Sequence, residues 1–339
     1  MSNASLPPNA PATNGIATQG HGEADVSSHP TNTPLSLEEV CAQLHSQVTS
    51  FLSATPQDDV TRRTQEQSRI ALGVIDKALR DYDRFEALSL SYNGGKDCLV
   101  LLILYLSALY AHFTRLKNER HDTNPPTFPT SIPSIYAKPP DPFPAVSSFV
   151  DYSSQLYHLD LTHISTNPGP TKKERSHSNP TITKPFPRVE GSKDGTTSDI
   201  DLPAKPIISF RDAFALYLDA HPSIKAIFVG TRRTDPNGAH LTHFDPTDHN
   251  WPTFMRIHPV IDWHLPEIWC FLRSPHLKDL ETGGPLKYCS MYDEGYTSLG
   301  GVNDTLKNPK LKERDENGNE FYRPAFEMTQ DEGERLGRE

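Results

Sequence analysis

The sequence predicts an α/β protein with an open, mostly parallel sheet and helices on both of its faces. Short apolar runs alternate with stretches of helical period between residues 86 and 229, which is the pattern of repeated strand–helix–strand units. Two of these runs, at residues 86–92 and 224–229, lead directly into loops rich in glycine or charge. Because the carboxyl ends of parallel strands share one edge of a sheet, both loops are expected at that edge, where such sheets bind ligands.

The chain before the first strand divides into a tail of residues 1–34 and the start of a folded domain of residues 35–339. The tail is rich in Ala, Asn, Pro, Ser and Thr and poor in aromatic residues, so we expect it to be disordered. Ser36 and Glu39 have the spacing of a capping box, which predicts the first helix. A second helix is predicted to bury the face formed by Ile70, Val74, Ala78 and Tyr82.

The first predicted strand turns into a helix through the segment Ser91-Tyr92-Asn93-Gly94-Gly95-Lys96-Asp97-Cys98. Paired glycines let a backbone approach an anion, and the first N–H groups of a helix point toward it with the positive end of the helix dipole. A lysine in the first helical turn opposes that dipole, so a bound anion would explain Lys96. The alternative is a tight glycine turn with a solvated lysine, since short glycine motifs also occur without ligands.

The following elements continue the alternation of strands and helices. Strands are predicted at residues 134–136 and 156–161, with helical spacing from Phe143 to Tyr157 between them. Residues 165–206 are rich in Pro, Ser, Thr, Lys and Gly, so we expect a disordered surface insertion. Ser209 then caps a helix, and the strand at residues 224–229 runs into the loop Gly230–Pro236.

Composition narrows the class of protein. The 339 residues carry a net charge of −10, which argues against a nucleic-acid-binding surface. Four scattered cysteines without zinc spacing suit a reducing compartment, and no secretory signal is visible. The longest apolar run, Leu99–Ala111, is too short to cross a bilayer. We therefore predict a cytoplasmic protein with neither a membrane nor a nucleic acid as its partner.

A second group of candidate site residues begins after Asp235, where the sequence shows neither a clear helical nor a clear strand pattern of apolar residues. All three tryptophans lie between residues 251 and 269, among other aromatic and charged residues. Aromatic side chains beside an anion site suit a flat second ligand, which binds by stacking. Ordinary core packing is the alternative, and it is the better explanation for Trp269, which lies on an apolar helix face.

The glycine loop resembles that of the ATP pyrophosphatases and PAPS-reductase-like enzymes, Ser-Gly-Gly-Lys-Asp-Ser. Four downstream segments and the tail resemble the eukaryotic FAD synthases of the single-domain fungal type. They are Gly230–Pro236, Trp251–Arg256, Pro259–Trp263, Gly295–Gly300 and Arg323–Arg338. The chain departs from the pattern at Cys98, where a serine is usual, and in the insertion of residues 165–206.

The resemblance implies the PAPS reductase-like (adenine nucleotide alpha hydrolase-like) fold with a C-terminal flavin-binding extension. It implies transfer of AMP from ATP to the phosphate of FMN, giving FAD and pyrophosphate, which is the last step of FAD biosynthesis. A phosphate monoester, with a second pKa of about 6, is already a nucleophile near neutral pH, so no strong general base is required. Mg²⁺, cationic side chains and backbone N–H groups are expected instead.

The resemblance also implies roles for individual residues. ATP would be held by Ser91, Tyr92, Gly94, Gly95, Lys96 and Arg232, with Ile135 and Tyr136 beside its adenine. Catalysis would fall to Asn93, Asp97 and Asp235, with Asp235 and Asn93 as ligands of Mg²⁺ and Asp97 as a further candidate. FMN would contact Trp251, Arg256, Arg335 and Arg338. Two alternatives stay open: Asp97 as a brace of the loop, and Arg335 and Arg338 as a solvated chain end.

Three rival functions share part of the pattern. A sulfonucleotide reductase needs a nucleophilic cysteine in its C-terminal tail, but the chain has none after Cys289. A tRNA-modifying ATP pyrophosphatase would favour paired cysteines and a basic surface. A flavin carrier that does not use ATP would not need the Gly-Gly-Lys-Asp loop. We therefore expect ATP and FMN as the partners, and client flavoproteins as recipients of FAD.

Overall fold

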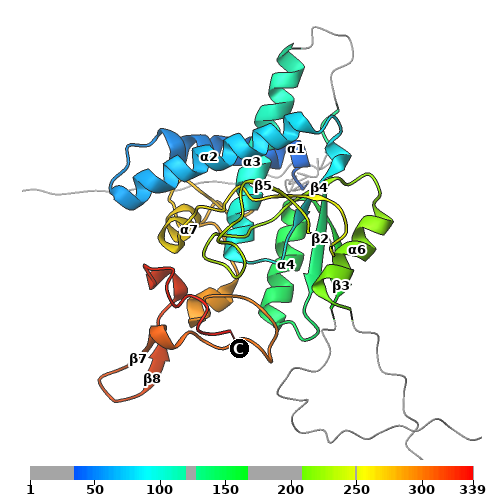
Figure 1. Cartoon of the computed structure of the whole chain (residues 1–339). Coiled ribbons are helices and arrows are strands. Elements are labelled where there is room, and N and C mark those ends of the chain that lie inside the picture. Colours follow the sequence, from blue (N-terminus) through cyan, green and yellow to red (C-terminus); the bar gives the residue numbers. More distant parts are fainter. Residues whose placement is uncertain (1–33, 120–126, 167–207, 249, 339) are drawn as a thin grey trace, which may run out of the picture. The chain divides into compact units, whose positions relative to one another are not determined.

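A computed structural model describes residues 34–119, 127–166, 208–248 and 250–338. The predicted disordered tail and most of the predicted insertion lie outside these residues. From Leu35 onward, the described residues form one compact unit built around a six-stranded sheet (Figure 1).

The sheet confirms the predicted open, mostly parallel arrangement. Its strands lie in the order β3-β2-β1-β4-β6-β5, and every neighbouring pair is parallel except β5 with β6. The strands are β1 (Leu88–Ser91), β2 (Ile132–Lys138), β3 (Leu159–Ser165), β4 (Ala226–Phe228), β5 (Phe244–Pro246) and β6 (Met255–Ile257). Strands β5 and β6 were not predicted, because three residues are too few to show an alternating pattern.

Helices cover both faces of the sheet, as predicted. One core cluster joins the sheet to α1 (Leu37–Ser53), α2 (Asp59–Asp81), α3 (Lys96–Glu119), α4 (Pro144–Leu156) and α7 (Leu265–Leu272). A second, smaller cluster packs α6 (Phe210–Ala220) against the opposite side chains of β2 and β4. From β1 the chain winds through α3 and α4 to β2 and β3, and then crosses through α6 to β4 on the other side of β1. This reversal creates a switch point between β1 and β4, which is where doubly wound sheets bind ligands.

Helix α3 is the central helix of the larger cluster, and α1 and α2 lie across it (Figure 1). It has 24 residues, so the prediction that this apolar segment is too short to span a bilayer is wrong. The helix is long and apolar enough to span one, but 72% of its most apolar window is buried inside the protein. Contacts with α1, α2 and α7 therefore account for its apolar composition.

The ends and faces of three elements refine the sequence predictions. Ser36 and Glu39 form both hydrogen bonds of the predicted capping box at α1. On α2, Val74 and Ala78 are buried as expected, but Ile70 is exposed because the apolar stripe runs through Ala71 and Ile75 instead. Strand β3 begins at Leu159, three residues later than predicted, because α4 extends to Leu156.

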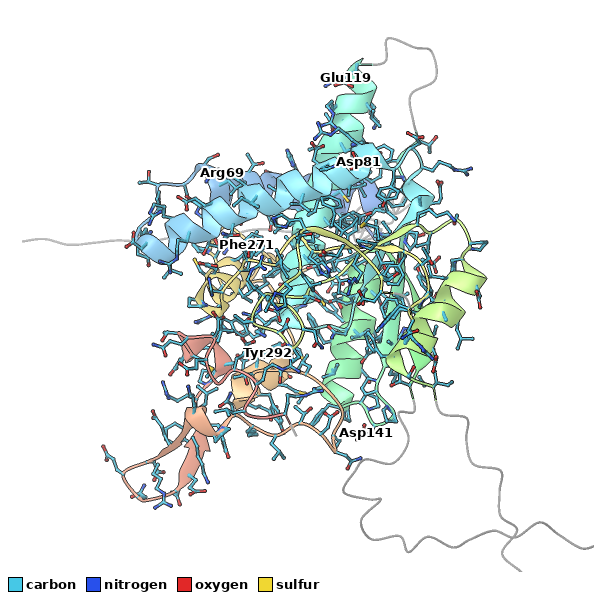
Figure 2. All side chains as sticks on the ribbon, in the orientation of Figure 1. Arg69, Asp81, Glu119, Asp141, Phe271 and Tyr292 are labelled. Atoms are coloured by element: carbon cyan, nitrogen blue, oxygen red, sulfur yellow. The ribbon has the colours of Figure 1, made fainter. Side chains whose placement is uncertain are left out.

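The C-terminal region has little regular structure. A hairpin of β7 (Lys312–Arg314) and β8 (Glu320–Tyr322) projects from the body of the protein, and its side chains are mostly exposed (Figure 2). Short 3-10 turns, η2 (Ser290–Glu294), η3 (Pro309–Leu311) and η4 (Ala325–Glu327), carry the rest of the chain back toward the sheet. The last described residues then return to the carboxyl ends of β1 and β4, as the contacts below show.

His258, directly after β6, is buried without a charge partner. Its side chain is 1% exposed, and neither ring nitrogen has a hydrogen-bond partner among the described residues. Burial, together with the nearby positive charge of Arg256, lowers the pKa of His258 to about 4. The imidazole is therefore neutral in the folded protein at neutral pH.

This burial predicts an acid-dependent loss of stability. An unfolded chain binds a proton at His258 below about pH 6.5, whereas the folded protein does so only near pH 4. The free energy of unfolding should therefore fall between these two pH values, by on the order of 2–3 kcal/mol from this group. Urea titrations at several pH values would measure the slope, and His258→Asn should flatten it. An unchanged slope in that variant would show that His258 is not the titrating group.

Candidate active site

The loop after β1 forms a tight turn into α3. Gly94 has a φ of +73°, and a Cβ there would lie 2.8 Å from Cγ2 of Val150 on α4, so only glycine fits. The N–H of Gly95 donates to Oδ1 of Asn93 at 2.9 Å, which holds the Asn93 side chain over the turn. Helix α3 begins at Lys96, as the glycine pattern predicts.

Lys96 lies under this turn with its ammonium group surrounded by oxygens. Its side chain is 3% exposed, and Nζ lies 3.0 Å from Oδ2 of Asp97 and 2.5 Å from Oε1 of Glu334. Nζ also donates to the carbonyl of Thr297 at 3.2 Å. Burial acts to lower the pKa of Lys96, but the two carboxylates outweigh burial and raise it, so the ammonium stays charged. The backbone N–H of Lys96 donates to the hydroxyl of Tyr292 at 2.9 Å.

The loop after β4 packs closely against the start of α3. A Cβ at Gly230 would lie 2.9 Å from Sγ of Cys98 and 3.0 Å from its backbone nitrogen, so a side chain there would force the two elements apart. Asp235 then turns back on its own loop, where its Oδ2 accepts the N–H of Arg232 at 2.9 Å. Burial, followed by the charge of Asp97, raises the pKa of Asp235 despite the hydrogen bond from Arg232.

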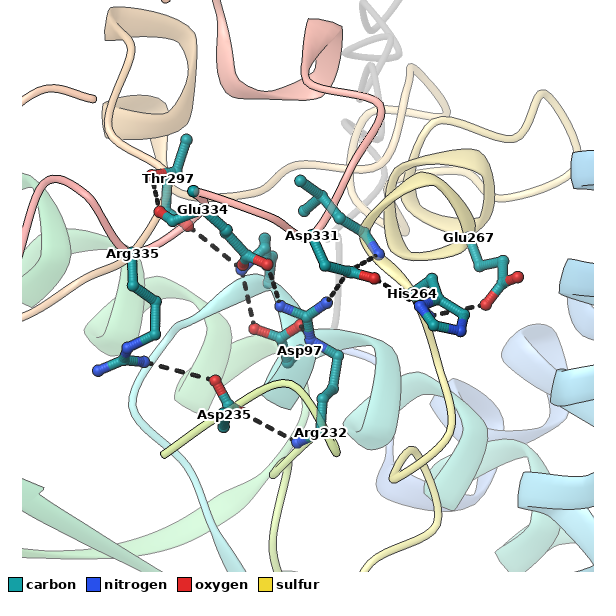
Figure 3. Close-up of polar contacts among 12 residues, drawn as sticks. Asp97, Arg232, Asp235, His264, Glu267, Thr297, Asp331, Glu334 and Arg335 are labelled. Atoms are coloured by element: carbon teal, nitrogen blue, oxygen red, sulfur yellow. Dashed lines mark hydrogen bonds and ion pairs between the residues drawn. The ribbon is translucent and has the colours of Figure 1, made fainter. Parts of the chain in front are cut away.

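The guanidinium group of Arg232 joins three segments of the chain (Figure 3). Its side chain is 1% exposed, with Nε 2.8 Å from Oδ1 of Asp97 on α3. Nη1 lies 3.0 Å from Oδ1 of Asp331, and Nη2 contacts Glu334. The Nε contact is an ion pair with poor hydrogen-bond direction, whereas the other two are hydrogen bonds. Despite burial, these carboxylates raise the pKa of Arg232 and keep it charged.

The tail that carries Asp331 and Glu334 makes several further contacts with the rest of the site. Asp331 accepts the N–H of Leu265 at 2.7 Å, and therefore caps the start of α7. The carbonyl of Glu334 accepts hydrogen bonds from the Thr297 hydroxyl and from Nδ2 of Asn308. Arg335, the next residue, places Nη1 3.4 Å from Oδ1 of Asp235 (Figure 3). The tail thus forms one wall of the site.

Two adjoining cavities open at this edge of the sheet. The first, which we call the loop cavity, has a volume of about 430 Å³ and is lined by Lys96, Asp97, Asp235, Tyr292 and Arg335, among others. The second, the strand-end cavity, has a volume of about 330 Å³ and is lined by Tyr136, Thr166, Asp304 and Arg338, among others. Asn93, Phe210 and Leu299 line both cavities.

Oxygen ligands for a hard cation are present at the loop cavity. Asp235 and Asn93 both line it, as does Asp97, and all three present carboxylate or amide oxygens. The described residues contain no group of three or more His, Cys, Asp or Glu side chains arranged to hold a metal alone. One or two protein carboxylates completed by substrate phosphates is the arrangement that Mg²⁺ prefers, so the site fits that ion.

The structure brings part of the predicted set together. Residues that line one or both cavities are Asn93, Gly95, Lys96, Asp97, Tyr136, Asp235, Arg335 and Arg338. Arg338 is held in the strand-end cavity by Thr305, at 3.1 Å from Nη1 to Oγ1, and by Asp304. The two tail arginines therefore line the cavities in the structure. They do not form the solvated chain end that was the alternative prediction.

Five predicted ATP-binding residues line neither cavity. Tyr92 is buried, with its hydroxyl donating to Ser153 on α4, and Gly94 packs on the same helix. Ser91 ends β1, and Ile135 belongs to the core cluster under α6. Arg232 likewise lines neither cavity, because carboxylates occupy its guanidinium group. In this geometry, Arg232 therefore has no direct path to a phosphate in either cavity.

Two predicted flavin-binding residues lie on the α6 side of the sheet. Trp251 is 36% exposed and packs edge-on against Phe210 and Phe214, and only Phe210 reaches the cavities. Arg256 lies within β6, where it donates to the carbonyl of Pro246 at 3.0 Å. Their contacts with FMN stay predictions.

Sequence reasoning missed three residues that shape the site: Tyr292, Asp331 and Glu334. All three lie in segments with neither helical nor strand period, where burial cannot be predicted from a pattern. One available signal was an acidic residue directly before Arg335, in a tail segment expected to bind anions.

Comparisons with known proteins agree with this geometry. The phosphoadenosine phosphosulfate reductase domain family matches residues 87–307. A probable FAD synthase of Schizosaccharomyces pombe is 35% identical over 277 residues, covering 81% of this chain and 79% of its own. The flavin adenine dinucleotide synthase of Saccharomyces cerevisiae is 30% identical over 285 residues, covering 82% and 77%.

Solved structures extend the likeness to three dimensions. The FMN adenylyltransferase of Candida glabrata, in complex with FAD and inorganic pyrophosphate, superposes with a TM-score of 0.68 at 25% identity, covering 91% of this chain and 99% of that one. The same enzyme with FMN and an ATP analogue also gives 0.68, at 26% identity, covering 91% and 98%. The family match and the identity to these relatives over most of their length agree with the site geometry. The chain therefore belongs to the FAD synthases, which are FMN adenylyltransferases of the phosphoadenosine phosphosulfate reductase domain family.

Proposed function

We propose that this protein transfers AMP from ATP to the phosphate of FMN, forming FAD and releasing pyrophosphate. The observation that carries the proposal is the convergence of three segments on one cavity: Lys96 from the β1 loop, Asp235 from the β4 loop and Arg335 from the tail. A relative of the same fold has been solved with FMN and an ATP analogue, and again with FAD and pyrophosphate. Both sets of ligands belong to this one reaction.

The loop cavity suits the phosphates of ATP. Gly95 and Lys96 line it at the start of α3, where the positive end of the helix dipole favours an anion. The strand-end cavity suits the adenosine part, because Tyr136 at the end of β2 and Thr166 just after β3 border it. Asn93 lines both cavities and therefore lies where the α-phosphate would pass between them.

Mg²⁺ would arrive with ATP and be held by Asp235 and Asn93, with Asp97 nearby. When bound, the ion supplies positive charge that neutralises the phosphate oxygens. Asp235 is suited to this role because its carboxylate lines the cavity and only the long contact with Arg335 occupies its Oδ1. Asp97 is held more firmly, by Lys96 and Arg232, and therefore also braces the loop.

The chemical step needs positioning more than acid–base catalysis. An oxygen of the FMN phosphate attacks the α-phosphorus of ATP, a new P–O–P bond forms, and the bond from the α-phosphorus to the bridging oxygen of pyrophosphate breaks. Pyrophosphate leaves with the electron pair, so no proton has to be removed from the nucleophile. Arg335, 44% exposed beside Asp235, is placed to contact one of the two reacting phosphates. Arg338, predicted to contact FMN, lines the strand-end cavity that we assign to adenosine.

Thiol chemistry finds no support at this site. Cys98 is the cysteine that lines the loop cavity, and burial followed by the charge of Asp97 raises its pKa to about 12. A thiol with such a pKa is protonated at neutral pH and is a poor nucleophile. All four cysteines are free in the structure, which suits the cytoplasmic location that we propose.

Incubation of the full chain with FMN, ATP and Mg²⁺ tests the proposal. Chromatography should show FAD and pyrophosphate in equal amounts, and omission of Mg²⁺ should abolish their formation because the phosphate charges are then uncompensated. Folded protein, checked by circular dichroism, that produces no FAD under these conditions would refute the proposed function.

Asp235→Ala should lower kcat for FAD formation by about 100-fold or more, since it removes an oxygen ligand of the metal and the partner of Arg335. The fold should persist, because Asp235 lies at the cavity edge and not in a core cluster. Asp315→Asn, in the exposed β7–β8 hairpin, is the matched control and should keep wild-type rates. Wild-type turnover by Asp235→Ala would remove this residue from the site.

A further inference from the structure

The ammonium group of Lys96 is surrounded by three protein oxygens in this structure. An ammonium carries three N–H groups, and three protein oxygens lie within reach of Nζ: Oδ2 of Asp97 at 3.0 Å, Oε1 of Glu334 at 2.5 Å and the carbonyl of Thr297 at 3.2 Å. The side chain is 3% exposed, so water offers no further partners. A phosphate oxygen that binds Lys96 therefore has to compete with these three oxygens.

Glu334 is the partner that can leave with least disturbance. Asp97 is fixed on α3 and pairs with Arg232 through its second oxygen, and the Thr297 carbonyl belongs to the backbone. The Glu334 side chain also has a second partner, because Oε2 contacts Nη2 of Arg232. Its backbone carbonyl is held independently by Thr297 and Asn308. Oε1 can thus turn away from Lys96 while the tail stays in place.

We propose that Glu334 is the resident counter-ion of Lys96 and competes with the phosphates of the substrate and product for the ammonium group. The proposal rests on the function proposed above and adds a residue that acts on it through Lys96. Glu334 is therefore a positioning residue. By occupying Lys96 whenever the phosphates are absent, it limits the affinity of the loop for pyrophosphate and favours release of this product.

The charges around the site support this competition. Four carboxylates, of Asp97, Asp235, Asp331 and Glu334, face the cations of Lys96, Arg232 and Arg335, and Asp331 also contacts the imidazole of His264. Removal of the Glu334 charge would make this cluster less anionic by one charge. An anion that enters this poorly solvated site would then meet less repulsion and a lysine with one partner fewer.

Glu334→Gln tests the proposal because glutamine keeps the size of the side chain and an oxygen for Arg232. We expect the variant to bind pyrophosphate with Mg²⁺ about fivefold to tenfold more tightly than wild type, as measured by calorimetry on the full chain. Inhibition of FAD synthesis by added pyrophosphate should strengthen to the same extent. The KM for ATP should fall together with kcat, because release of the product becomes slower.

A purely structural role for Glu334 predicts the opposite result. Loss of a tail contact would then weaken pyrophosphate binding and raise the KM for ATP. Equal or weaker pyrophosphate binding by a folded Glu334→Gln variant overturns the inference, while FAD synthesis by the wild type leaves the proposed function intact. If the wild type makes no FAD, the proposed function fails whatever the variant does.

Three further variants sharpen the test. Glu332→Gln, on the same tail but exposed, should bind pyrophosphate as wild type does. In a Lys96→Met background, Glu334→Gln should give no gain in pyrophosphate affinity, and a full gain there would show that Glu334 does not act through Lys96. Should Glu334→Gln not fold, Glu334→Ala decides, because it removes the carboxylate from Lys96 and must also bind pyrophosphate more tightly than wild type.

Discussion

The buried guanidinium group of Arg232 is the constraint on which the rest of the site depends. An unpaired charge in this position would cost several kcal/mol, so the chain must bring carboxylates to it. They come from α3 and from the C-terminal tail, in Asp97, Asp331 and Glu334. Because the same tail segment caps α7 through Asp331 and carries Arg335 to Asp235, one buried cation organises both walls of the loop cavity.

This arrangement explains how a site for two anionic substrates can be built in an acidic protein. Lys96 and Arg232 are kept charged by carboxylates that lie inside the site, so the cations are present before any phosphate arrives. In our proposal, those carboxylates also limit the affinity of the site for anions, since phosphates would compete with them for Lys96. The chemistry needs charge and alignment, and the structure provides both without a strong base.

Much of the fold could be predicted from the sequence because parallel strands and their helices leave regular patterns. The glycine loop and the Asp235 loop were placed correctly at one sheet edge, since each follows a recognisable strand.

The remaining contacts of the site could not be predicted, because they depend on segments with neither helical nor strand periodicity. Glu334 and Tyr292 are buried by tertiary packing alone. Arg232 was expected at phosphate, but nothing local in the sequence indicates that the tail would neutralise it. Trp251 and Arg256 were named by family resemblance, and the three-residue strand β6 that positions Arg256 is too short to recognise.

Hydrogen exchange of the tail in an Arg232→Met variant tests the central claim most directly. Loss of the buried cation should release Asp331 and Glu334, so amides of residues 331–338 should exchange on the order of 100-fold faster. The strands of the sheet should keep their protection, and FAD synthesis should fall. Arg233→Met is the matched control, because Arg233 is 43% exposed and pairs with Asp262 outside the cavities. A tail that stays protected in Arg232→Met, with undiminished FAD synthesis, would contradict the account.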